Sequence, residues 1–201
     1  SSFPKNVREF FSEKEVGRFI EMFELRSNQL SMSEFIENNL KDKKISLIEA
    51  SPGTGKTMAY LAPIALKAAE EGIKAVIATN TKALQDQIVN KDWLLINKYL
   101  STVNKKNEIK LSILKGRKNY ICKKLVKNFI PSNFSELRVY FKIYKWSLLT
   151  LHGDISEVDL KNEFPIFLNF SAINESCIKK CTDCYVINAR NNAKKSNIIL
   201  T

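Results

Sequence analysis

The 201-residue sequence lacks any long hydrophobic run. Lys or Glu interrupts its longest apolar stretches, which argues against a membrane-spanning helix or a secretory signal peptide and predicts a cytoplasmic protein with no membrane partner. Internal repeats and low-complexity linkers are also missing. His152 is the one histidine, so a metal site built from several histidines is excluded. A hydrophobic content of 44% still predicts a globular chain with a sizeable core.

Glycine is scarce as well, with six residues, but two of the six stand in one motif. Residues 49–57 read Glu-Ala-Ser-Pro-Gly-Thr-Gly-Lys-Thr. Gly53 and Gly55 allow the backbone to close around phosphates. Lys56 supplies a positive charge for the terminal phosphates, and the Thr57 hydroxyl is placed to ligate Mg²⁺. The motif therefore predicts a nucleoside triphosphate site with Lys56 and Thr57 as catalytic residues, and the alternative is a glycine-rich turn that binds nothing.

Regular elements are expected on both sides of this motif. Strands are predicted at residues 45–48, 74–79, 109–114 and 196–201, and helices at 26–40, at 58–71 with Gly72 as the C-cap, and from Thr81 onward. The first two strands and the helix between them would form a unit with a right-handed crossover and parallel strands. Short helices and loops are expected over residues 116–185. The fold class predicted from this pattern is α/β with a parallel sheet.

Positive charge is concentrated in one part of the chain. The net charge is +11, and residues 105–127 carry nine Lys or Arg against one acidic residue, Glu108. Such a surplus attracts a polyanion through counterion release, in a way that weakens with salt. Nucleic acid is the expected partner, and the alternative is a solvated Lys-rich surface.

The four cysteines are Cys122, Cys177, Cys181 and Cys184, with gaps of 54, 3 and 2 residues between them. Three clustered thiols and one distant thiol form the pattern of a four-cysteine metal site. Disulfides are disfavoured because the expected compartment is reducing. Unlinked free thiols remain an alternative, and the spacing by itself leaves both zinc and an iron–sulfur cluster open.

In their order along the chain, these motifs resemble the N-terminal part of a DinG/XPD-type superfamily 2 iron–sulfur DNA helicase. The resemblance covers about residues 23–201 and is weakest over 127–170. Besides the phosphate loop, Phe23–Arg26 with Gln29 and Met32 is similar to the family's adenine-recognising segment. Thr79–Gln87 is similar to a motif that touches the DNA single strand. Residues 114–122 and 177–185 are similar to the borders of the iron–sulfur domain.

The resemblance implies a RecA-like P-loop motor domain with a parallel sheet, interrupted by a mostly helical iron–sulfur insertion. The expected divisions are a lead-in at 1–20, the first part of the motor domain at 21–115, the insertion at 116–188 and a return strand at 189–201.

The resemblance also implies which residues bind each ligand. ATP and Mg²⁺ would be bound by Arg26, Gln29, Ser51, Pro52, Gly53, Thr54, Gly55, Lys56 and Thr57, with Gln29 reading the base. A 4Fe–4S cluster would be ligated by Cys122, Cys177, Cys181 and Cys184. DNA would be contacted by Thr79, Thr81, Lys82, Gln85, Arg117, Lys118 and Tyr120.

The implied function is that of an ATP-dependent DNA helicase in DNA repair. It would act as a monomer on single strands and junctions and translocate 5′ to 3′. No strand-like run is followed by an Asp-Glu pair, so the acidic residue that would hold Mg²⁺ and polarise the attacking water is missing. These 201 residues are therefore not expected to hydrolyse ATP or unwind DNA alone. The alternatives are a nucleotide- and nucleic-acid-binding module with structural zinc, and a small P-loop kinase acting on a metabolite.

Overall fold

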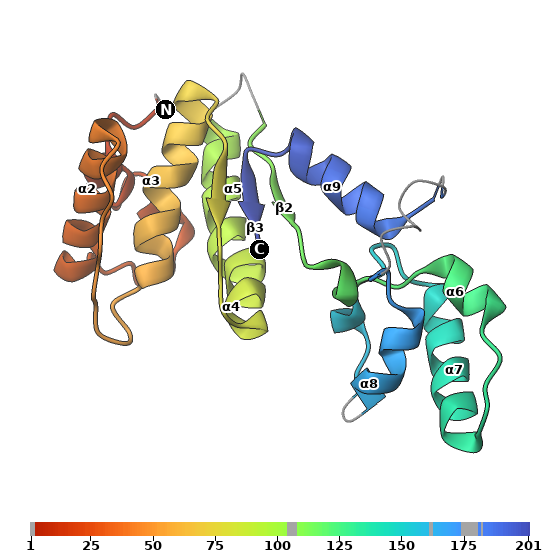
Figure 1. Ribbon diagram of the computed structural model, residues 1–201. Coiled ribbons are helices and arrows are strands. Elements are labelled where there is room, and N and C mark those ends of the chain that lie inside the picture. Colours follow the sequence, from red (N-terminus) through yellow and green to blue (C-terminus); the bar gives the residue numbers. More distant parts are fainter. Residues whose placement is uncertain (1–2, 104–107, 161–162, 174–180, 182) are drawn as a thin grey trace. The chain divides into compact units, whose positions relative to one another are not determined.

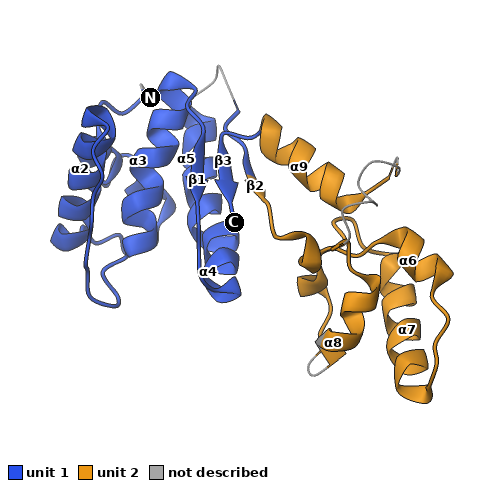
Figure 2. Ribbon diagram, viewed as in Figure 1, with its two compact units in different colours: residues 1–111, 196–201 blue, residues 112–195 orange. Residues whose placement is uncertain are grey.

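The computed structural model describes residues 3–103, 108–160, 163–173, 181 and 183–201 (Figure 1). Two compact units make up the chain: unit 1 contains residues 1–111 and 196–201, and unit 2 contains residues 112–195 (Figure 2). The elements of unit 1 are α1 (Val7–Phe10), η1 (Val16–Phe19), α2 (Ser27–Asp42), α3 (Lys56–Glu71), β1 (Ala75–Ile77), α4 (Lys82–Gln87), the π-helical turn η2 (Ile88–Asp92), α5 (Trp93–Val103) and β3 (Ile198–Leu200), while β2 (Leu111–Ile113) begins at the unit's boundary.

The sheet has the strand order β1-β3-β2. Strands β1 and β3 are parallel, with Ala75 opposite Ile198 and Ile77 opposite Leu200. Ile198 and Leu200 are fully buried, as expected for an apolar strand at the centre of a parallel sheet. The predicted strands at 74–79, 109–114 and 196–201 are thus confirmed, although each is shorter than expected.

The predicted strand at residues 45–48 is wrong. This segment has no strand pairing in the structure, and Ile45 and Leu47 are completely exposed. A strand forms only where a neighbour accepts its backbone hydrogen bonds, and the order β1-β3-β2 provides no neighbour for these residues. The expected strand–helix–strand unit is therefore absent from the described residues, and the parallel pair joins β1 to the distant β3 instead.

The helices begin and end at the signals that the sequence carries. Helix α3 ends at Gly72, which has a φ of 69° and donates its N–H to the Ala68 carbonyl. Helix α4 begins after Thr81, whose hydroxyl accepts the Leu84 N–H at 3.3 Å. These local caps confirm the predicted helices at 58–71 and from Thr81, and α2 confirms the helix predicted at 26–40.

The N-terminal lead-in is part of the core of unit 1. Phe10 is fully buried and packs edge-on against the Tyr99 ring of α5, with a centroid distance of 5.0 Å. The Tyr99 hydroxyl donates to Glu15 at 2.9 Å, and burial raises the pKa of Tyr99 far above its usual value. Arg18 donates to the Thr102 hydroxyl at 2.8 Å. No role for residues 1–20 was evident from their sequence, and the structure shows that they anchor α5.

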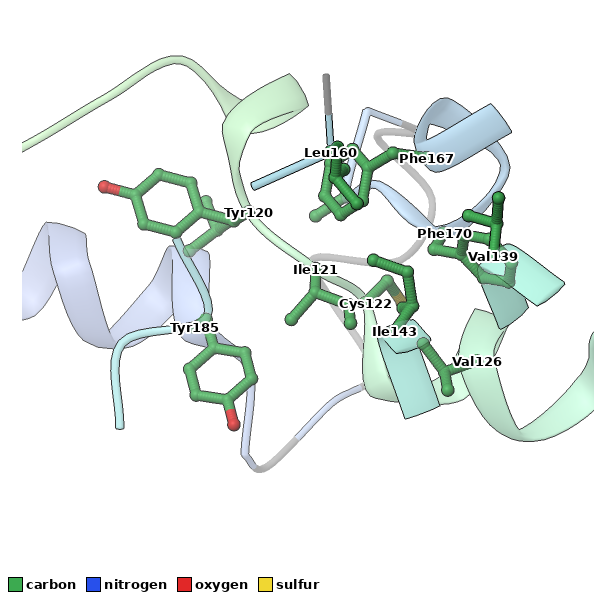
Figure 3. Packing of buried hydrophobic residues seen from close by; sticks show 12 residues of the cluster. Tyr120, Ile121, Cys122, Val126, Val139, Ile143, Leu160, Phe167, Phe170 and Tyr185 are labelled. Carbon is green, nitrogen blue, oxygen red and sulfur yellow. The ribbon is translucent and has the colours of Figure 1, made fainter. Parts of the chain in front are cut away.

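Unit 2 is built around a second hydrophobic core. Its elements are η3 (Arg117–Asn119), α6 (Lys123–Asn128), α7 (Phe134–Ser147), η4 (Ile155–Glu157), α8 (Phe164–Phe167), η6 (Leu168–Phe170) and α9 (Tyr185–Lys195). Figure 3 shows core residues contributed by several of these elements, among them Val126, Ile143, Phe170 and Tyr185. The short helices expected over 116–185 are present.

Residues 120–122 form the centre of this core. The Ile121 N–H donates to Gly153 at 2.8 Å and the Cys122 N–H donates to Phe170 at 2.7 Å. Nearby, Lys115 forms a mostly buried ion pair with Asp154 at 2.6 Å, and its side chain also donates to Ser156 at 3.1 Å. Segments far apart in sequence are thereby joined to the stretch that carries the first cysteine.

In the described parts of the chain, no helix combines the length and the apolar character needed to cross a bilayer.

Candidate nucleotide-binding site

The phosphate loop precedes α3 in unit 1. Gly53 and Gly55 have φ values of 80° and 78°, in the left-handed region that glycine adopts without strain. Gly55 is also the N-cap of α3, so the first N–H groups of a 16-residue helix follow the loop directly. Free N–H groups and the positive end of the helix dipole favour an anion at this position. The backbone geometry therefore suits a phosphate group.

Lys56 leaves its charge available at this loop. Its side chain is exposed, and Nζ donates to the Ala50 carbonyl at 2.6 Å. Within the described residues, no carboxylate forms an ion pair with Lys56. A carbonyl oxygen does not neutralise an ammonium group, so the positive charge can still attract a phosphate that displaces this contact.

Two residues from the start of α2 reach the loop. Arg26 donates from Nη1 to the Gly53 carbonyl at 3.1 Å, and Gln29 donates from Nε2 to the Gly55 carbonyl at 3.0 Å. The sequence separates these pairs by 27 and 26 residues. The structure thus brings Arg26 and Gln29 together with the loop, and here the Gln29 amide contacts the loop backbone.

A cavity of about 520 Å³ lies beside the loop. Its lining includes Asn28, Met32, Phe35, Ser51 and Thr54. A volume of this size lies within the range of small-molecule sites, and the lining combines polar and apolar side chains. Ser51 and Thr54 form the border between the cavity and the loop. The Thr54 hydroxyl donates a hydrogen bond to the Ser51 carbonyl.

Behind the loop, Thr57 belongs to a small polar cluster. Thr57 and Asp92 are 8% and 7% exposed. The Gln87 Nε2 lies 3.1 Å from Asp92 Oδ2 and 3.4 Å from Thr57 Oγ1. Burial raises the pKa of Asp92, against the opposing effects of the Gln87 hydrogen bond and the Lys91 charge. Burial also raises the pKa of Tyr60, whose hydroxyl bonds with Thr57. Asp92 was not predicted as a site residue, and no motif in the sequence marks it.

Comparison with known proteins identifies the family of this chain. Residues 30–132, which include the phosphate loop, β1 and α4, match the model of the DEAD/DEAH box helicase family. The chain belongs to this helicase family. This confirms the predicted family, and a helicase domain of this kind implies a RecA-like fold.

Several curated relatives align over most of the chain. The "ATP-dependent DNA helicase YoaA" of Haemophilus influenzae is 34% identical over 92% of the chain and 29% of its own length. YoaA of Escherichia coli is 29% identical over 96% of the chain and 30% of its own length. The "3'-5' exonuclease DinG" of Bacillus subtilis is 26% identical over 94% of the chain and 21% of its own length. The chain thus spans less than a third of the length of these relatives.

Four of the predicted DNA contacts gather at one end of β1. Thr79 follows β1 and donates its N–H to Thr201 at 2.8 Å, beside β3. Thr81 and Lys82 are exposed at the start of α4, and Gln85 is half-buried one turn later. Because ligands bind at the carboxyl ends of parallel strands, this position suits a binding surface.

The other three predicted DNA contacts lie in unit 2. Lys118 is exposed and Arg117 is half-buried in η3. Tyr120 is 3% exposed, and its hydroxyl accepts the Lys115 N–H at 3.0 Å. A side chain buried and bonded in this way belongs to the core, so the structure contradicts a direct Tyr120 contact with DNA. Arg117 and Lys118 remain the candidates from this segment.

Three of the four cysteines lie in the described residues, and all three are free thiols. Cys122 is buried in the core of unit 2, and Cys184 packs against the same core. Lys123, next to Cys122, pairs with Asp183, next to Cys184, and lies 4.7 Å from the Tyr185 ring centroid. Cys177 lies outside the described residues. Among the described side chains, no three potential metal ligands of the His, Cys, Asp or Glu type come together.

Proposed function

We propose that this chain is the nucleotide-binding first part of an ATP-dependent DNA helicase that acts in DNA repair. The observation that carries the proposal is the phosphate loop. It has two glycines at positive φ and an unneutralised Lys56, it lies in the segment that matches the helicase family, and Arg26 and Gln29 contact it from just before that segment. The named activities of the YoaA relatives agree with it. The proposed helicase acts as a monomer and translocates 5′ to 3′.

In the proposed site, ATP binds with its phosphates over the loop and Mg²⁺ at Thr57. Nucleotide contacts come from Arg26, Gln29, Ser51, Pro52, Gly53, Thr54, Gly55, Lys56 and Thr57. Bound Mg²⁺ would neutralise charge on the terminal phosphates. The loop N–H groups orient these phosphates, and Lys56 leaves the Ala50 carbonyl to meet them. Arg26 and Gln29 hold the loop backbone open, so that little reorganisation is needed on binding.

Single-stranded DNA is the proposed partner. Thr79, Thr81, Lys82 and Gln85 would contact its backbone in unit 1, and Arg117 and Lys118 would contact a junction in unit 2. Residues 112–195 carry 15 Lys or Arg against 7 Asp or Glu, so unit 2 accounts for eight of the eleven net positive charges. Binding to DNA by this surplus should weaken as salt is raised.

Unit 2 is proposed to hold a 4Fe–4S cluster on Cys122, Cys177, Cys181 and Cys184. The donor set fits the group, because the described cysteines form no disulfide and such clusters are ligated by four thiolates. The pairing of Lys123 with Asp183 supports a short separation between the segments of Cys122 and Cys184. When bound, the cluster would link these segments as a rigid element at the DNA junction.

The nucleotide part of the proposal is tested with Lys56→Ala in the full-length protein. We expect ATP turnover in the presence of single-stranded DNA to be lost, because Lys56 supplies the charge for the terminal phosphates. Lys67→Ala is the matched control, since Lys67 lies on the same helix and pairs with Glu71 instead. DNA-independent ATP turnover in the wild type would refute the helicase function and favour a metabolite kinase.

The cluster is tested with Cys181→Ser in protein purified without oxygen. We expect the wild type to be brown with broad visible absorbance, and the variant to lose this absorbance and duplex unwinding while still binding nucleotide. Lys56→Ala should keep the absorbance. A colourless wild type with stoichiometric zinc would contradict the iron–sulfur assignment. Duplexes with a 5′ or a 3′ single-stranded tail test the direction of translocation.

A further inference from the structure

The polar cluster behind the phosphate loop connects two parts of unit 1 that have separate proposed roles. Thr57 lies in the first turn of α3, where Mg²⁺ is proposed to bind. Gln87 is the last residue of α4, and Asp92 is the last residue of the π-helical turn that follows. The sequence motifs assign no function to Asp92, although its side chain is buried.

The π-helical turn explains why Asp92 meets Gln87. In an α-helix, residues five apart point about 140° away from each other, at 3.6 residues per turn. A π-helical turn bonds each residue to the fifth one along, so it returns side chains at this spacing to one face. Gln87 and Asp92 are five residues apart across such a turn, and their side chains are hydrogen-bonded at 3.1 Å. Turns of this type are rare and are frequent at functional sites.

Gln87 can bond to both neighbours at once. Its side-chain amide has two N–H groups, and Nε2 lies within hydrogen-bonding distance of Asp92 Oδ2 and Thr57 Oγ1. Asp92 is buried and fixed in position, so its carboxylate orients the amide toward Thr57. The Thr57 contact, at 3.4 Å, is long and is the weaker of the two. A change in the position of the Thr57 hydroxyl therefore alters its contact with Gln87.

The same helix carries proposed DNA contacts at its other end. Thr81 caps α4, Lys82 is its first residue, and Gln85 lies one turn later. Helix α4 has six residues, so Gln87 and the residues proposed to contact DNA lie on one short helix, which continues into η2. Thr57 and the DNA-contacting turn are thus joined by one hydrogen bond, from Gln87 to Thr57, and one short helix, while the second bond of Gln87 ties it to Asp92.

We propose that Gln87 and Asp92 are positioning residues that couple nucleotide binding at Thr57 to single-stranded DNA binding at α4. The inference rests on the proposed helicase function. Binding at Thr57 reorients the threonine hydroxyl, Gln87 follows, and Asp92 fixes the direction in which Gln87 can move. By linkage, DNA bound at α4 changes nucleotide affinity by the same factor.

The coupling is measured in the full-length protein by the anisotropy of a labelled oligo-dT. Its Kd is determined with and without Mg²⁺ and a non-hydrolysable ATP analogue, and the ratio of the two Kd values is the coupling factor. We expect a wild-type ratio of at least about fivefold, in either direction. Gln87→Ala and Asp92→Leu should bring the ratio to within about twofold of one. Oligo-dT affinity without nucleotide and nucleotide affinity without DNA should be nearly unchanged.

Two further variants separate positioning from stability. Asp92→Asn keeps an oxygen that accepts from Gln87, so it should retain most of the wild-type ratio. Asp86→Leu is the matched control, because Asp86 is an exposed carboxylate on the same helix and should leave the ratio unchanged. Gln87 is also exposed, so Gln87→Ala is expected to fold even where Asp92→Leu does not.

The outcomes distinguish the inference from the function on which it rests. A wild-type ratio well away from one that persists in Gln87→Ala overturns the coupling role and leaves the helicase function intact. A loss of coupling in Asp86→Leu equal to that in Gln87→Ala overturns it as well. A wild-type ratio of one refutes both proposals.

Discussion

Gly55→Ala tests the contact between α2 and the phosphate loop, and Gly53→Ala is its matched control. Both glycines have positive φ, so an alanine at either position is strained by about 1–2 kcal/mol. The surroundings differ. A Cβ on Gly53 meets nothing within 4 Å, whereas a Cβ on Gly55 would lie 2.2 Å from Gln29 Nε2. The Gln29 amide would have to move and would lose its bond to the residue 55 carbonyl, at a cost of about 1 kcal/mol.

We therefore expect Gly55→Ala to lower the unfolding free energy by about 1 kcal/mol more than Gly53→Ala does. The effect of alanine on the unfolded chain is shared by both variants and cancels in the difference. Unfolding of unit 1 in urea can be followed by Trp93 fluorescence in a Trp146→Phe background, because the two tryptophans of the chain lie one in each unit.

A double-mutant cycle completes this test. In a Gln29→Ala background, Gly55→Ala should lower the unfolding free energy no more than Gly53→Ala does, because the Gln29 side chain that would clash with the new Cβ is absent. Equal costs of Gly53→Ala and Gly55→Ala in the wild-type background would show that Gln29 does not hold the loop. An excess cost that persists without Gln29 would lead to the same conclusion.

The other predictions concern two buried carboxylates. Burial holds the Asp92 pKa above 3.8, so its ionised form destabilises unit 1 at neutral pH. We expect Asp92→Asn to raise the unfolding free energy most at neutral pH. The gain over the wild type should shrink as the pH falls through the folded-state pKa of Asp92 toward 3.8. A gain in unfolding free energy that does not change with pH would contradict this expectation. In unit 2, Lys115→Met should cost about 3 kcal/mol in unfolding followed by Trp146, because it leaves the mostly buried Asp154 carboxylate without its cationic partner. Lys115→Met with Asp154→Leu should recover most of this loss, and equal instability of the single and double variants would count against it.

The amino-acid sequence by itself determined the features that depend on near neighbours. Gly72 and Thr81 cap helices through hydrogen bonds to residues within four positions, so the boundaries of α3 and α4 follow from local signals. The phosphate loop is equally local, because its function needs particular residues in a fixed order. The cysteines and the excess of Lys residues could likewise be seen in the sequence, and the metal site proposed for the cysteines stays a prediction.

Tertiary structure decided what depends on distant partners. Residues 45–48 have the composition of a strand but no neighbour to pair with, while β1 pairs with β3, more than a hundred positions along the chain. Tyr120 was predicted to face DNA, but the Lys115 N–H and the surrounding core bury it. The Gln87–Asp92 contact needs a π-helical turn, which no local signal indicated. Strand pairing, burial and side-chain contacts are set by which segments fold against each other, and a single sequence does not contain that information in any local pattern.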